Sequence, residues 1–190
     1  MALDLSALRR IIADENCLLT GADIPAEYQS DVLGRVHGSA EALAFPLSTE
    51  EVSAILRYAH EHRVPVTPRG AGTNLVGSTV PLEGGIILDL SRMDRVLELD
   101  EDTSIGGNIS TNAGGMRAVK YGVTRDYVRG LEVVLADGTV MQVGGKQVKD
   151  ASGLSLKHLL IGSEGTLAVI TKCLLRLVPK PEASLSVLVP

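Results

Sequence analysis

The chain has 190 residues, of which 18 are Lys or Arg and 23 are Asp or Glu, so its formal net charge is −5. This acidic balance argues against nucleic acid as a partner, because a phosphate-binding face needs an excess of cations. Hydrophobic residues make up 45% of the chain, enough for a packed globular core. Cys17 and Cys173 are too far apart for a metal motif, and neither a signal peptide nor an apolar run of about 20 residues is found. We therefore expect a cytoplasmic protein without a metal site or a transmembrane segment.

Two helices are expected in the first third of the chain. From Asp4 to about Ala13 the apolar residues recur at helical spacing, and Asp4 is a suitable N-cap. The second helix begins after Ser48, which forms a capping-box pattern with Glu51, and its apolar face continues to about His62.

The strands are expected mainly in the second half. The pattern predicts strands at 64–67 and 85–90, an edge strand at 95–100, a hairpin of 131–135 and 139–143 around a Gly-containing turn, and a long β-rich run at 166–178 that could hold two strands. Pro179 to Pro181 is typical of a linker, and the apolar stretch 184–189 follows it. Too few helices lie between strands for a doubly wound sheet, so the fold class predicted is α+β.

The composition is unusual in its glycines. There are 20 glycines and only five aromatic residues, and fourteen of the glycines lie between Gly70 and Gly145. Glycine concentrates where the backbone turns sharply or approaches a ligand closely. Three small-residue stretches result, which we call loop 1 (68–79), loop 2 (105–115) and loop 3 (162–166).

Loop 1 can form a nest of backbone N–H groups that binds phosphate without lysine. It is neither of the common phosphate motifs, because Leu75 replaces a glycine of the dinucleotide fingerprint and Ser78 replaces the lysine of a P-loop. Taken alone, loop 1 could equally be a tight structural turn. Loop 2 holds four small polar residues between two Gly-Gly pairs. Such residues could hydrogen-bond a polar ligand that approaches the backbone, but they are also common in turns. The spacing of four between Ile105, Ile109 and Ala113 favours an ordered segment.

Together these motifs resemble the FAD-linked oxidase family, which shares its flavin domain with vanillyl-alcohol oxidase and UDP-N-acetylenolpyruvoylglucosamine reductase. Within that family, the chain is most similar to the branch of glycolate oxidase FAD subunits and D-lactate and D-2-hydroxyglutarate dehydrogenases. The resemblance covers nearly the whole chain and rests on the stretches 68–73, 106–115, 121–122, 130–134 and 162–167.

The resemblance implies a two-part FAD-binding domain at 1–182, with a small α/β part at about 1–92 and a larger α+β part at about 93–182. Loop 1 would hold the FAD pyrophosphate, loop 2 would run along the flavin and its ribityl chain, and loop 3 with the strand after it would border the adenosine half. Thr73 stands where covalently flavinylated relatives have histidine, so the FAD is expected to be non-covalent. The implied cofactor-binding residues are Pro68, Arg69, Gly70, Ala71, Gly72, Thr73, Asn74, Gly77 and Ser78 in loop 1, Gly107, Asn108, Ser110, Thr111, Asn112, Gly114 and Gly115 in loop 2, and Glu164, Gly165 and Ile170.

The family reaction moves a hydride from C2 of a 2-hydroxy acid to the flavin N5, with groups that come largely from a C-terminal substrate domain. Residues 183–190 would be the start of that domain, so no catalytic residue is assigned. Between Thr103 and Ser104 the family has a further strand, helix and Pro-rich loop that this chain lacks. We therefore expect weak or no FAD binding and no activity from this chain alone. The alternatives are a truncated, non-catalytic module in a complex with partner subunits and a flavoprotein similar to the cell-wall reductase.

Other polar residues carry weaker signals. Arg117, Lys120, Arg125 and Arg129 form a basic cluster that could face a phosphate or an anionic substrate, although a solvated face is the more common role of such a run. None of the four histidines lies in a pattern that assigns it a catalytic role.

Overall fold

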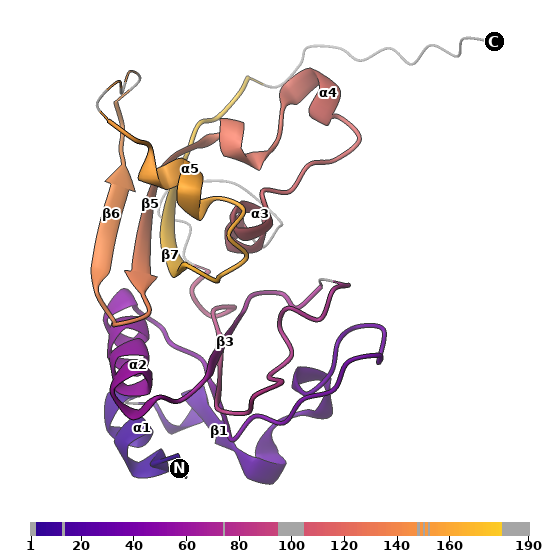
Figure 1. Ribbon diagram of the computed structural model, residues 1–190, viewed down its shortest axis with the longest axis vertical. Coiled ribbons are helices and arrows are strands. Elements are labelled where there is room, and N and C mark those ends of the chain that lie inside the picture. The colour runs from indigo at the N-terminus through magenta and orange to yellow at the C-terminus, as the bar shows by residue number, and fades with distance from the viewer. Residues whose placement is uncertain are drawn as a thin grey trace, which may run out of the picture.

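The computed structural model describes residues 3–12, 14–73, 75–94, 105–147, 149, 151 and 153–179. The predicted edge strand at 95–100, the junction at 103–104 and residues 180–190 lie outside these residues. The described chain forms two sheets, one from each half of the sequence (Figure 1). The mixed α+β class predicted from the sequence is confirmed.

The first sheet has the order β1-β2-β4-β3. Its strands are β1 (Leu18–Thr20), β2 (Ala42–Ala44), β3 (Val66–Arg69) and β4 (Ile86–Asp89), with β2, β4 and β3 parallel and β1 antiparallel to β2. All four residues of β4 are buried, as expected for an apolar strand between two neighbours. The 3₁₀ turn η1 (Glu15–Cys17) leads from α1 (Leu5–Ile11) into β1, and η2 (Gly21–Asp23) and η3 (Ala26–Tyr28) lie between β1 and β2.

Both predicted N-terminal helices form. Asp4 caps α1, and Ser48 caps α2 (Thr49–His62) by accepting a hydrogen bond from the backbone N–H of Glu51. At the other end of α2, the N–H of Val64 donates to the carbonyl of Ala59. Because Val64 serves the helix end, the strand expected from residue 64 begins only at Val66, a small correction to the sequence-based limits.

The second sheet is antiparallel with the order β6-β5-β7. Its strands are β5 (Val128–Leu135), β6 (Val140–Gly144) and β7 (Ala168–Leu175), so the predicted hairpin is confirmed and the long β-rich run forms one strand. The short helices α3 (Ile105–Thr111) and α5 (Leu156–Leu160) lie beside this sheet, and α4 (Ala118–Tyr121) lies farther from it (Figure 1). The 3₁₀ turn η4 (Thr124–Asp126) precedes β5.

Helix α2 joins the two halves. Its buried residues Val52 and Ile55 share one apolar cluster with Val134 of β5 and Val169 of β7. At its N-terminus, Thr49 Oγ1 donates a 2.7 Å hydrogen bond to Glu132 Oε1 on β5. This shared core sets the distance between the two sheets, and therefore between the glycine loops that each sheet carries.

Candidate functional site

Loop 1 leaves the end of β3 and turns at Gly72, whose φ of +68° is a conformation that favours glycine. The structure records no hydrogen bond from the backbone N–H of Gly70, Ala71, Gly72 or Thr73 to another described residue. Consecutive free N–H groups around a turn form an anion-binding concavity. Loop 1 therefore has the donors that a phosphate requires.

The side chain of Arg69 lies against this loop. A Cβ at Gly72 would collide with Arg69 Nη2, so the guanidinium packs directly against this glycine. The guanidinium also lies over the ring of Tyr28, with Cζ 4.5 Å from the ring centroid. Arg69 Nη1 is buried and has no hydrogen-bond partner in the described part of the chain. Arg69 thus places a positive charge beside the free N–H groups.

Loop 2 is a helix followed by a turn. Residues 105–111 form α3, and Ile109 at its centre is fully buried in the core of the second sheet. The apolar spacing of four is explained by this helix, and the ordered interpretation of loop 2 is confirmed. The polar groups are partly used within the fold, because Thr111 Oγ1 donates to the Gly107 carbonyl (3.0 Å) and Asn112 Oδ1 accepts from the N–H of Arg125 (3.0 Å).

Loop 3 connects the other two loops. The N–H of Gly162 donates to the Ile109 carbonyl (3.1 Å), and the N–H of Glu164 donates to the Ser110 carbonyl (2.8 Å). On its other side, a Cβ at Gly165 would lie 2.9 Å from Pro68 Cγ, so loop 3 passes directly over the start of loop 1. Residues far apart in sequence are therefore assembled into one continuous site.

Arg125 was expected to lie on a solvated face, but it is part of this assembly. Besides its N–H bond to Asn112, its Nη2 donates to the Ile161 carbonyl at 3.3 Å, and its buried Nε has no partner among the described residues. Arg125 thus connects the turn after α3 to loop 3. The residue type alone could not distinguish it from its exposed neighbours Arg117 and Lys120.

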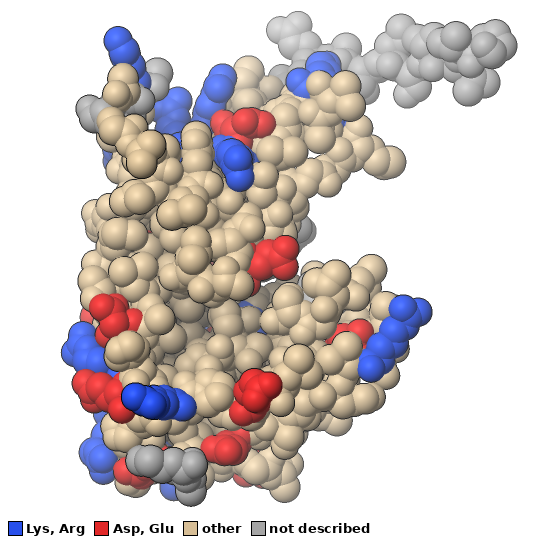
Figure 2. Space-filling model, viewed as in Figure 1, with Lys and Arg blue, Asp and Glu red and all other residues tan. Residues whose placement is uncertain are grey.

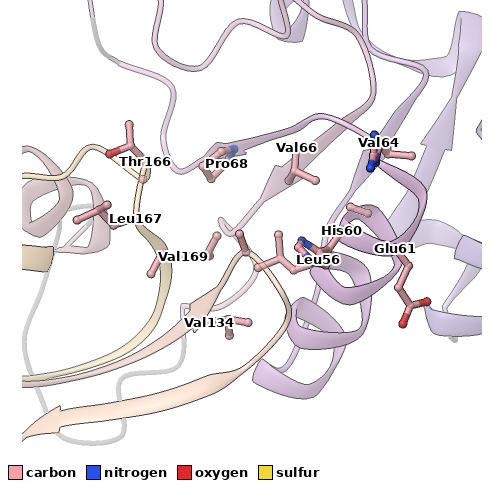
Figure 3. Close-up of a pocket in the computed structure, with 15 residues that line it drawn as sticks. Leu56, His60, Glu61, Val64, Val66, Pro68, Val134, Thr166, Leu167 and Val169 are labelled. Carbon is pink, nitrogen blue, oxygen red and sulfur yellow. The ribbon is translucent and has the colours of Figure 1, made fainter.

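A cavity of about 790 Å³ lies where the two halves meet beside loops 1 and 3. Figure 3 shows Leu56 of α2, Val66 and Pro68 of β3, and Leu167 and Val169 along its walls, to which His60, Glu61 and Thr166 add polar groups. This volume falls within the range of small-molecule sites, which is about 300–1,000 Å³. In the space-filling view the surface is hollowed between the two halves, and few charged side chains line the visible part of the hollow (Figure 2).

Not every predicted residue lies in this assembly in the same way. Gly77 packs against Val36, Gly114 packs against Val123, and Gly115 has open space around it. The Ile170 side chain packs into the core of the second sheet, so only its backbone could face a ligand. Asn74 lies outside the described residues. Tyr28 was not predicted, because it lies about 40 residues before loop 1 in an otherwise unremarkable stretch.

Comparison with known proteins identifies the family. Residues 40–104 and 101–144 match the family described as FAD binding domain, which is more than half of the chain. The chain belongs to this FAD-binding family. FAD is the cofactor of the family, and no covalent attachment is indicated.

The chain is 41% identical over 196 residues to the glycolate oxidase subunit GlcD of Bacillus subtilis, covering 85% of this chain and 42% of that protein. It is 46% identical over 169 residues to a D-lactate dehydrogenase of Archaeoglobus fulgidus, covering 71% of this chain and 38% of that protein. A solved structure of alkyldihydroxyacetonephosphate synthase has the same fold, with a TM-score of 0.78, 22% identity and coverage of 96% of this chain and 45% of that one. The chain thus spans less than half the length of these proteins.

The matches also show an internal gap. The alignment with the Bacillus subtilis protein is 196 positions long, but 85% of 190 residues is only about 162, so about 35 positions have no residue here. The family match is split into two stretches that meet at residues 101–104. This is where the sequence predicts missing residues.

Two further features were searched for in the described residues. No helix there is long and apolar enough to cross a membrane. No group of three or more metal-ligating side chains is found among them.

Proposed function

We propose that the chain is the FAD-binding portion of a flavin-dependent 2-hydroxy acid dehydrogenase or oxidase of the glycolate or D-lactate type. The observation that carries the proposal is the convergence of three glycine loops in a chain of this family, one of which has four backbone N–H groups that donate to no other described residue. When bound, FAD supplies the hydride acceptor. The relatives named above act on glycolate or D-lactate according to their names, and the substrate class is taken from them.

The role of this chain's own residues is to bind and orient the cofactor. The N–H groups of residues 70–73 would hold the two phosphates, with the charge of Arg69 next to them. The cavity beside Pro68 and Gly165 is the space available to the adenosine half. The turn at 112–115 would lie along the flavin side. Glycine at positions 72 and 165 keeps these surfaces close enough for the loops to close.

The remaining site assignments belong to the same proposal. The sequence-predicted residues of all three loops are retained as the cofactor site, and the two parts at about 1–92 and 93–182 are retained as its two walls. A small 2-hydroxy acid and partner subunits complete the proposal, the latter because the Bacillus subtilis relative is named as a subunit.

The gap near residues 103–104 determines how strongly the isolated chain should bind. Removing about 35 positions beside the second sheet leaves apolar surface in water and opens the site. We therefore expect saturable FAD binding weaker than about 1 µM and no dye reduction with glycolate or D-lactate.

The test is a fluorescence titration of the chain with FAD, beside a variant in which the corresponding segment of the Bacillus subtilis relative is inserted between Thr103 and Ser104. The insertion is expected to raise FAD affinity at least about tenfold. A matched pair, Gly165→Val against Gly153→Val, checks the site, because both glycines have positive φ but only Gly165 contacts Pro68. Absence of saturable FAD binding by both the chain and the inserted variant would refute the proposed function.

A further inference from the structure

Four side chains from the first half of the chain contact one another in series, and the series ends at Arg69 beside loop 1. Arg92 lies 5.2 Å from the ring centroid of Phe45, Phe45 meets Tyr28 edge-on at 6.2 Å, and Arg69 lies 4.5 Å from the centroid of Tyr28. The chain has only five aromatic residues, and two of them are used here. In this order of cation, ring, ring and cation, each guanidinium has one aromatic ring as an electrostatically favourable partner.

The Tyr28 hydroxyl is hydrogen-bonded to the carboxylate of Asp89. Asp89 is only 2% exposed and lies directly opposite Arg69 in the β3–β4 register. The pKa of Tyr28 is raised by burial, and further by the negative charge of Asp89 and the hydrogen bond to it. The phenol is therefore neutral at physiological pH, and its ring presents an uncharged face to Arg69.

This arrangement explains why Arg69 stays beside the loop. The guanidinium lies against Gly72 and also against the Tyr28 ring. The buried Nη1 has no acceptor among the described residues, and a donor in that state gains most from an added anion. In a chain with a net charge of −5, a cation held at the phosphate position also offsets the unfavourable overall field.

We propose that Tyr28 is a positioning residue of the phosphate site: it holds the Arg69 guanidinium beneath loop 1, where the charge supports the diphosphate bound by the backbone of residues 70–73. This inference rests on the proposed function and names a residue that acts through another. Its ligand chemistry is a diphosphate, either within FAD or as free pyrophosphate.

The experiment uses the full chain and three variants. Tyr28→Leu removes the ring, Tyr28→Phe keeps it, and Tyr58→Leu removes a similar ring of the same half that stacks on His62, away from loop 1. The first readout is the Arg69 Nε–H signal in NMR spectra of the ligand-free chain, which a neighbouring ring shifts. The second is the dissociation constant for FAD and, separately, for riboflavin, which has no phosphate.

Tyr28→Leu is expected to remove the ring-induced shift of Arg69 and to weaken FAD binding about tenfold without changing riboflavin binding. Tyr28→Phe should restore both readouts, and Tyr58→Leu should leave both as in the parent chain. An unchanged Arg69 signal and FAD affinity in Tyr28→Leu would overturn the inference, and so would a Tyr28→Phe variant as impaired as Tyr28→Leu.

Failure of the proposed function can be told apart from failure of this inference. If the parent chain does not bind FAD, pyrophosphate is titrated while the amide signals of residues 70–73 are followed. A response in the parent that is weakened in Tyr28→Leu supports the inference, and no response overturns it. If Tyr28→Leu does not fold, Arg69→Met takes its place, because it removes the guanidinium charge and keeps the Tyr28 ring. Arg69→Met should weaken the pyrophosphate response. A response equal to that of the parent chain overturns the inference.

Discussion

Glu132 is the side chain through which the two halves of the chain are most directly connected. It is 8% exposed on β5 and accepts hydrogen bonds from Thr49 of α2, Gln142 of β6 and Thr171 of β7. It also forms an ion pair with Lys172 at 2.9 Å. Burial alone would raise the pKa of Glu132, but the hydrogen bonds from Lys172, Thr49 and Gln142 outweigh burial and lower the pKa from 4.5 to about 2.

The lowered pKa has a defined effect on stability. Because the folded pKa lies below the unfolded one, the carboxylate contributes stability that is complete above the unfolded pKa and is lost as the pH falls toward about 2. A shift of this size corresponds to about 3 kcal/mol at pH 7, and about 2 kcal/mol of it should be lost between pH 7 and pH 3. Replacement by glutamine, Glu132→Gln, removes the charge at nearly constant shape, so the variant should be less stable at pH 7 by up to this amount.

The assay is urea unfolding of the parent and of Glu132→Gln at a series of pH values from 7 to 3. The difference in free energy of unfolding should be largest at pH 7 and should shrink steadily as the pH falls below the unfolded pKa of Glu132. Lys172→Met is the control, because the Lys172 side chain is 54% exposed and its loss should cost at most about 1 kcal/mol. A difference between parent and Glu132→Gln that is the same at pH 7 and pH 3 would show that the charge of Glu132 is not the source of the stability.

Three further substitutions test other contacts, all by urea unfolding at pH 7. Ser48→Ala should lower stability by about 1 kcal/mol, because it removes the N-cap hydrogen bond of α2, and Ser48→Asp should restore it. Gly138→Ala should lower stability by more than about 2 kcal/mol, because the new Cβ would lie 2.6 Å from a backbone carbonyl oxygen of α2. The control Gly21→Ala, at a glycine that also has a positive φ but has no atom near its Cβ position, should lower stability by only about 1–2 kcal/mol. Equal losses of stability in the two variants would contradict the packing explanation. Arg125→Met should lower stability by about 1–3 kcal/mol, because the Ile161 carbonyl loses its Nη2 donor although the backbone N–H bond to Asn112 remains. No change would show that the two loops stay together without the guanidinium.

The longer helices and strands could be predicted from the sequence, and the shortest ones could not. Helix α2 was located because its capping pair and apolar face extend over four turns, and the β5–β6 hairpin because a Gly-containing turn separates two β-prone stretches. Strands β1 and β2 have three residues each, too few for any periodicity to show. Their pairing is instead decided by the tertiary contacts of Ala42 and Ala44, which are fully buried beside β4.

The candidate site, like the fold, has residues that the sequence could predict and residues that it could not. The glycine loops were recognisable because a backbone-binding site leaves its mark in composition, and composition is local in the sequence. Tyr28 and Arg125 leave no such mark, because each matters only through what the fold places beside it: a guanidinium from β3 for Tyr28 and a carbonyl of loop 3 for Arg125. A residue that positions another has no characteristic spacing, and only the three-dimensional arrangement can reveal it.

The gap near residues 103–104 concerns both the elements that carry the loops and the contacts among the loops. The short strands and α2 that carry loop 1 are complete without it, and loops 2 and 3 remain bonded to each other through Gly162 and Glu164. What the missing positions would change is the enclosure of the site rather than the contacts among the loops. Affinity for a diphosphate and affinity for the flavin ring should therefore respond differently to restoring the segment. The loop 1 donors already exist, whereas a site open to water gains most at its apolar surfaces, so riboflavin binding should improve by a larger factor than pyrophosphate binding.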